Sequence, residues 1–166
     1  MEPSNALTIL KNAFFMESQG KILYETARDN AQNKAVKDFF QALADDEVEH
    51  IAILERQIKS YMDTGRFTAS EQGEGHKDKG PDILNDEIKN SINTAGFEAT
   101  AITAAIGFEK KAVELYAKRS KASDDPEEKK LYQWLSEWEK THLEKLVSLQ
   151  QALMDRVWGD NSFWPM

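Results

Sequence analysis

The chain carries one pattern of polar residues twice, in copies that lie 92 positions apart. In each copy a glutamate is followed seven residues later by a tyrosine, and 30 residues later by a Glu-x-x-His motif. The two copies are Glu17, Tyr24, Glu47 and His50, and then Glu109, Tyr116, Glu139 and His142. Because a repeat at a fixed offset indicates one structural unit used twice, we expect two similar helical hairpins.

Apolar residues around both copies recur every three or four positions, which is the period of an amphipathic helix. The expected helices are residues 5–29 and 34–62 in the first hairpin, and 85–122 and about 126–158 in the second. Asp125 and Glu128 should form a capping box at the start of the last helix. We therefore predict an all-α fold, a four-helix bundle made of two antiparallel hairpins.

The segment between the two hairpins has a different composition from the helices. Residues 63–84 contain glycines and a proline that break any helical pattern, so we expect a long crossover connection. A chain of 166 residues is most simply one domain, so residues 1–166 are predicted to form a single four-helix unit.

Composition excludes several classes of site. The chain has no cysteine, which rules out disulfides, iron–sulfur clusters and thiolate zinc sites. A net charge of −8 argues against a nucleic-acid partner. No apolar segment is long enough to span a bilayer and the start of the chain has no signal-peptide pattern, so we expect a cytoplasmic protein that does not bind membranes.

The duplicated glutamates and histidines predict a metal site. Positions i and i+3 share one face of a helix, so Glu47 and His50 point into the same space, and Glu139 and His142 do so as well. The inner faces of the helices are otherwise apolar, and four ionised carboxylates there would each cost several kcal/mol. Two divalent cations would neutralise them, and the histidines would complete the coordination.

Three points stay open at this level. Protonation of two or more glutamates is the competing way to remove their charge. Tyr24 and Tyr116 are either core aromatics or donors that orient a ligand carboxylate. The small residues Gly20 and Ala112 either leave room for an oxidant or let the helices approach closely. Trp134 and Trp138 flank the last helical stripe and are interpreted as packing residues, with electron transfer as the alternative role.

These motifs resemble the ferritin-like superfamily, and specifically the rubrerythrin-like di-iron proteins. The resemblance covers nearly the whole chain and includes Glu17-x6-Tyr24, Glu47-Val-Glu-His50, Glu109-x6-Tyr116 and Glu139-Lys-Thr-His142. It implies two iron ions, with manganese or zinc as other occupants. It also implies that Glu17 and Glu109 are terminal ligands, that Glu47 and Glu139 bridge the metals, and that each histidine binds one metal.

Two departures from the rubrerythrin pattern matter. The chain lacks the cysteine-rich rubredoxin module, so any electron donor must be external. It has Ala112 where rubrerythrins carry an additional glutamate, which leaves a symmetric set of six ligands closer to that of bacterioferritin.

The resemblance implies a non-haem di-iron oxidoreductase that reduces peroxide or dioxygen, of the peroxidase or ferroxidase type. The alternative is an iron-binding or storage protein without significant catalysis, and a third interpretation is a structural bundle with an inert metal. We expect a homo-oligomer, most simply a dimer.

Overall fold

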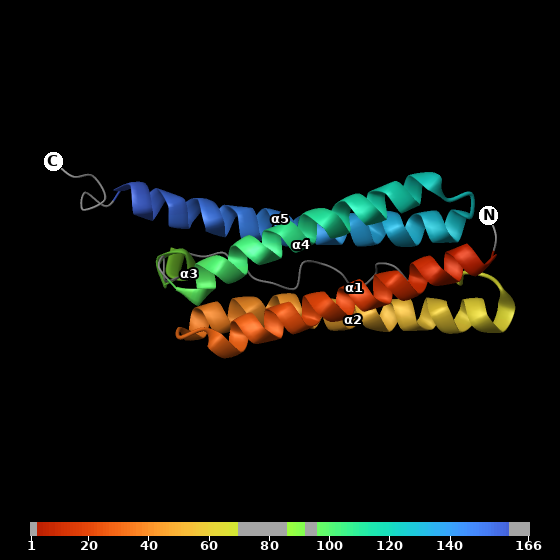
Figure 1. The fold of residues 1–166 in the computed structure, drawn as a ribbon, viewed down its shortest axis with the longest axis horizontal. Helices are drawn as coiled ribbons and strands as arrows, with labels where there is room; N and C mark the ends of the chain where they lie inside the picture. The colour runs from red at the N-terminus through yellow and green to blue at the C-terminus, as the bar shows by residue number, and fades with distance from the viewer. Residues whose placement is uncertain (1–2, 70–85, 92–95, 160–166) are drawn as a thin grey trace.

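The computed structural model describes residues 3–69, 86–91 and 96–159. Four long helices form a bundle and a short fifth helix lies at one end (Figure 1). They are α1 (Pro3–Asn30), α2 (Lys34–Thr64), α3 (Asp86–Ser91), α4 (Phe97–Ala122) and α5 (Pro126–Gly159). α1 and α2 form one antiparallel hairpin, and α4 and α5 form the other, so the predicted all-α bundle of two hairpins is confirmed. In the described part of the chain, none of the helices is long and apolar enough to cross a membrane.

The two hairpins are joined so that α2 and α4 run in the same direction (Figure 1). The connection therefore starts at one end of the bundle and finishes at the other, which is what the predicted crossover requires. Gly65 ends α2 with a positive φ of 69°, a conformation that favours glycine. Thr68 then folds back on α2, because its N–H donates to Gln57 Oε1 at 3.1 Å and its carbonyl accepts from Gln57 Nε2 at 3.2 Å. Most of the predicted crossover, from residue 70 on, lies outside the described residues.

The single helix predicted over residues 85–122 is wrong. α3 ends at Ser91 and α4 begins at Phe97, and Gly96 between them has an extended backbone with φ −112° and ψ −170°. An extended residue cannot continue the helical hydrogen-bond pattern. Glycine also has a low helix propensity, about 1 kcal/mol below alanine, so the chain loses little by leaving the helix there.

The last helix begins as predicted, with one difference in its cap. Asp125 Oδ1 accepts from the N–H groups of Glu127 at 2.8 Å and Glu128 at 3.3 Å. The Glu128 side chain does not return to Asp125. It lies buried, accepting from Ser123 Oγ at 2.6 Å and from Arg119 Nε at 2.7 Å, and so ties the start of α5 to the end of α4.

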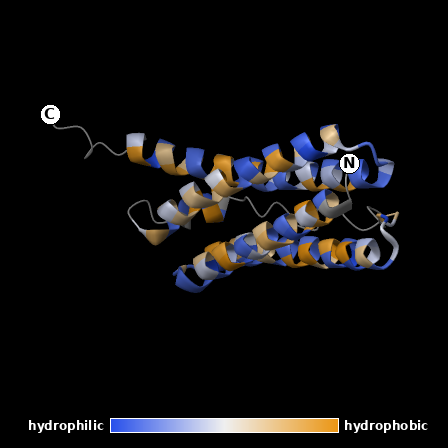
Figure 2. Cartoon of the chain, turned by 45° about the vertical axis from the view of Figure 1, so that its right-hand side comes forward, coloured by the Kyte–Doolittle hydropathy of each residue, from blue (hydrophilic) through white to orange (hydrophobic). Residues whose placement is uncertain are grey.

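The apolar core is divided into two clusters, one toward each end of the bundle. One contains Phe40 and Leu149, from the start of α2 and the end of α5. The other contains Leu10 and Leu131, from the start of α1 and the start of α5. Polar and apolar residues alternate along every long helix, as expected of amphipathic helices with one buried face (Figure 2). The duplicated glutamates and histidines lie between the two clusters.

Small residues line the side of α1 that faces α4. Ala13, Gly20 and Ala27 are all buried and lie seven residues apart. A Cβ atom at Gly20 would lie 2.8 Å from Phe108 Cε1 of α4 and 3.5 Å from Glu47 Cδ. The space beside Gly20 is therefore filled by the Phe108 ring, which favours close packing over an open pocket at this position.

Replacing Gly20 with alanine should destabilise the protein by about 1–2 kcal/mol, because the added methyl overlaps the Phe108 ring. Gly107→Ala is the matched control, since a Cβ there meets nothing within 4 Å. That change should stabilise the helix by about 0.5–1 kcal/mol. Chemical unfolding of both variants measures the difference, and equal stabilisation by the two alanines would contradict the close packing.

Candidate metal centre

The six predicted ligand residues meet in the polar layer at the middle of the bundle. α1 contributes Glu17, α2 contributes Glu47 and His50, α4 contributes Glu109, and α5 contributes Glu139 and His142. All six are at most 1% exposed. Each Glu-x-x-His pair reaches the layer because residues three apart lie on the same face of their helix. The structure thus brings together every residue that the duplicated pattern singled out.

The six residues form two groups that share two members. Ligand atoms of Glu17, Glu47, His50 and Glu139 lie within 4.8 Å of one another, and so do those of Glu47, Glu109, Glu139 and His142. The shared residues are Glu47 and Glu139, the two glutamates expected to bridge. Each group also has one histidine and one glutamate of its own, so the two halves offer the same ligand chemistry.

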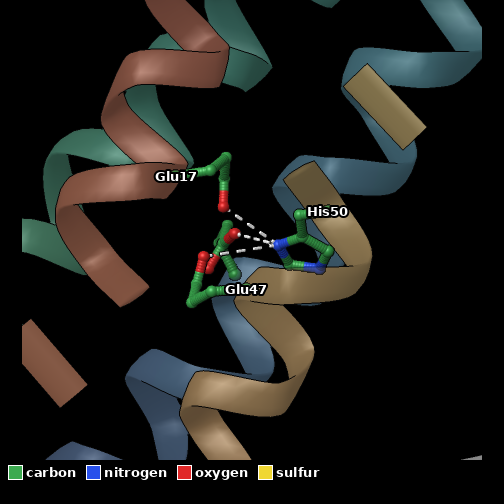
Figure 3. Close-up of side chains that lie close together, drawn as sticks. Glu17, Glu47 and His50 are labelled. Carbon is green, nitrogen blue, oxygen red and sulfur yellow. Dashed lines mark hydrogen bonds and ion pairs between the residues drawn. The ribbon is translucent and has the colours of Figure 1, made fainter. Parts of the chain in front are cut away.

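The Nδ1 atom of His50 lies among three carboxylates. It is 2.8 Å from Glu139 Oε1, 3.1 Å from Glu17 Oε2 and 3.6 Å from Glu47 Oε2. Glu17 reaches it from α1, and Glu47 from the same helix as His50 (Figure 3). One nitrogen carries at most one proton and cannot donate to three carboxylates at once. Its lone pair and the carboxylate oxygens instead fit a common cation.

His142 has the equivalent arrangement in the other half. Its Nδ1 atom lies 3.1 Å from Glu139 Oε2, 3.3 Å from Glu47 Oε1 and 3.4 Å from Glu109 Oε1. The two imidazole rings lie 6.0 Å apart, on either side of the shared glutamates. Carboxylates and imidazoles together suit iron, manganese or zinc.

The two buried tyrosines connect the hairpins through this layer. Tyr24 of α1 donates from its hydroxyl to Glu109 Oε1 of α4, and Tyr116 of α4 donates to Glu17 Oε1 of α1. Both tyrosines are completely buried. Each hydroxyl thus fixes the unshared carboxylate of one group, which favours the orienting role for these residues over that of simple core aromatics.

In the absence of a cation, protons must balance the cluster. Burial and the neighbouring carboxylates raise the pKa of Glu47 and of Glu109 to about 8. Burial also opposes ionisation of Glu17. A hydrogen bond with Glu47 and the positive charge of His50 nevertheless lower the pKa of Glu17 to about 2. Burial opposes the charged form of both histidines, but neighbouring carboxylates, chiefly Glu139 at His50 and Asp46 at His142, raise the pKa of each ring above its usual value.

Several carboxylate oxygens of the ionised cluster have no hydrogen-bond donor, and a bound cation would be a partner for them. With the carboxyls ionised, both oxygens of Glu47 and Oε2 of Glu109 have no hydrogen-bond donor among the described residues. Buried oxygens without partners are costly. Divalent cations would satisfy these atoms and remove the repulsion in one step, so the residues present fit a metal pair.

Asp46 is a polar neighbour of the cluster that the sequence analysis missed. Its Oδ2 atom accepts from His142 Nε2 at 2.8 Å and from Trp138 Nε1 at 3.3 Å. Trp138 also packs on His50, with ring centroids 4.4 Å apart, and Trp134 lies next to both rings. Both tryptophans pack at the edge of the cluster, and Trp138 also donates a hydrogen bond to Asp46. In the sequence, the feature that could have indicated Asp46 is its position directly before Glu47.

Replacing Glu47 with glutamine should stabilise the cation-free protein at high pH. The folded state raises the pKa of Glu47 from 4.5 to about 8, so it binds a proton that the unfolded chain releases. Protonated Glu47 therefore makes its whole contribution to the free energy of unfolding below pH 4.5. This contribution is lost as the pH rises through about 8, where the folded protein releases the proton. Relative to wild type, E47Q should gain roughly 2 kcal/mol at about pH 9 and much less at about pH 5.

Unfolding of chelator-treated protein by urea at the two pH values measures this gain. Glu55→Gln, on an exposed position of α2, is the control and should change little. A gain of the same size at both pH values would contradict the raised pKa.

Comparison with protein families identifies a match over most of the chain. The model of the rubrerythrin family matches residues 8–150, which include all six residues of the cluster and both tyrosines. Searches of curated proteins and of solved structures gave no significant match.

Proposed function

Because the chain belongs to the rubrerythrin family, we propose that its buried cluster binds two iron ions and that the protein is a non-haem di-iron oxidoreductase. The observation that carries the proposal is the pair of four-residue groups that share Glu47 and Glu139. Two ferrous ions held there would supply the electrons that reduce peroxide or dioxygen.

Each residue of the cluster has a distinct role in this proposal. Glu47 and Glu139 would bridge the two positions, because they belong to both groups. His50 and His142 would each hold one ion through Nδ1, the nitrogen that faces the carboxylates. Glu17 and Glu109 would be the terminal ligands. Four carboxylates match the charge of two divalent ions, so the bound cluster with neutral histidines would have no net charge.

The tyrosines and the apolar ends of the bundle hold this arrangement in place. Burial and neighbouring carboxylates raise the pKa of both Tyr24 and Tyr116, so their hydroxyls stay protonated and keep donating to Glu109 and Glu17. The apolar clusters on either side of the layer limit the access of water, which strengthens the electrostatic interactions inside it.

The electrons in this proposal come from outside these 166 residues, which contain no cysteine for a rubredoxin-type centre. Iron is the proposed ion, and manganese or zinc suits the same ligands. Cytoplasmic location and a homodimer remain predictions. A cage of many subunits would instead be expected of a storage protein, and native mass distinguishes the two.

Alanine at either shared glutamate should lower the content of both metal ions, whereas alanine at Glu17 or Glu109 should mainly affect one. The reason is that Glu47 and Glu139 belong to both groups and the other two glutamates to one each. Elemental analysis of protein from the native source and of the purified variants measures this, with Glu55→Ala as the control. Full metal content in both E47A and E139A would refute the bridging assignment.

Protein reconstituted anaerobically with ferrous iron should be oxidised by peroxide and should turn over when a reductant is supplied. Stopped-flow absorption follows the oxidation, and consumption of peroxide follows turnover. The E47A variant should lose both signals. An unreactive ferrous centre would contradict the oxidoreductase, and a single oxidation without turnover would favour iron binding alone.

A further inference from the structure

The two candidate metal positions have matching ligands. Each has one histidine, the two shared glutamates, and one further glutamate that accepts a hydrogen bond from a tyrosine of the other hairpin. Ligand type and number therefore give no reason for the two positions to differ. Any difference between them must come from residues outside the six.

The residues that precede the shared glutamates break this symmetry. Asp46 and Trp138 are equivalent in the duplicated pattern, since they lie 92 positions apart, each directly before a shared glutamate. Asp46 of α2 reaches across to α5 and accepts from His142 Nε2 at 2.8 Å. This bond holds a proton on His142 Nε2, so that Nδ1 is the nitrogen that would bind a cation.

His50 has no such partner. Its Nε2 atom is buried and has no hydrogen-bond partner among the described residues. The equivalent side chain, Trp138, places its ring 4.4 Å from the imidazole at an interplanar angle of 83°. An indole offers no acceptor, and its N–H instead donates to Asp46 at 3.3 Å.

We propose that the two metal positions are unequal, that the position of His142 binds its cation more tightly than the position of His50, and that Asp46 is the positioning residue responsible. A carboxylate on the outer nitrogen of a ligating histidine fixes the ring and raises its basicity, and its loss typically lowers metal affinity about 10- to 100-fold. The inference rests on the proposed metal centre. It predicts that a limiting supply of cation fills the His142 position first.

Anaerobic titration of chelator-treated protein with Co²⁺ tests this without any measurement of activity. Absorption in the visible range, with a competing chelator, should give two binding steps whose affinities differ about 10- to 100-fold. The variant His50→Ala should retain the tight step, and His142→Ala should lose it.

The variant Asp46→Ala should weaken the tight step about 10- to 100-fold and leave the weak step unchanged. Asp45→Ala is the matched control, because Asp45 is the preceding residue, is exposed and accepts a hydrogen bond only from Gln41 among the interactions of the described residues. The variant Trp138→Asp supplies the missing acceptor to His50 and should tighten the weak step. Thermal unfolding followed by circular dichroism establishes that each variant is folded, and if D46A is not, the result for W138D decides.

The outcomes separate the two proposals. Two steps of equal affinity in wild type, or an unchanged tight step in folded D46A, would overturn the inequality and leave the metal centre intact. The absence of any Co²⁺ binding to the cluster would overturn the proposed function itself.

Discussion

Four carboxylates converge on one buried layer of a helical bundle, and the rest of the structure depends on how their charge is balanced. Each ionised carboxylate in an apolar core costs several kcal/mol, and mutual repulsion adds to this cost. Protons on Glu47 and Glu109, together with charged histidines, balance the layer when no cation is bound. A pair of divalent cations would balance it more completely, because it would also provide a partner for the oxygens of Glu47 that have no donor.

The duplicated hairpin is what makes such a layer possible. Each hairpin supplies one lone glutamate and one Glu-x-x-His pair, and the apolar clusters toward the two ends of the bundle stabilise the fold that holds them. The hydrogen bonds from Tyr24 to Glu109 and from Tyr116 to Glu17 cross between the hairpins. Packing of the two hairpins therefore also orients the two carboxylates that accept these hydrogen bonds.

Spacing along helices was sufficient to predict the bundle, the two hairpins and the six residues that meet in its centre. The break before Phe97 was missed because periodicity continues across residues 85–122, whereas the extended backbone at Gly96 depends on the path of the chain between the hairpins. Asp46 was missed for a similar reason. Asp46 directly precedes Glu47, and so it lies off the inner face of α2. Only the arrangement of α2 beside α5 brings its side chain to His142.

The departure from symmetry at Asp46 and Trp138 shows how a duplicated site can acquire two different halves. The six residues of the cluster are matched, whereas the residue before the shared glutamate is a carboxylate at Asp46 and an indole at Trp138. This difference alters the surroundings of a histidine without altering the six residues themselves. It also gives Asp46 two donors, His142 and Trp138, which ties α2 to α5 at the level of the buried layer.

The most direct test of the central claim is anomalous diffraction at the iron edge from crystals of protein purified from its native source. The account predicts two anomalous peaks in the layer, each beside the Nδ1 atom of one histidine and both in contact with Glu47 and Glu139. A layer without such peaks, with its carboxyls bonded to one another through protons, would contradict it.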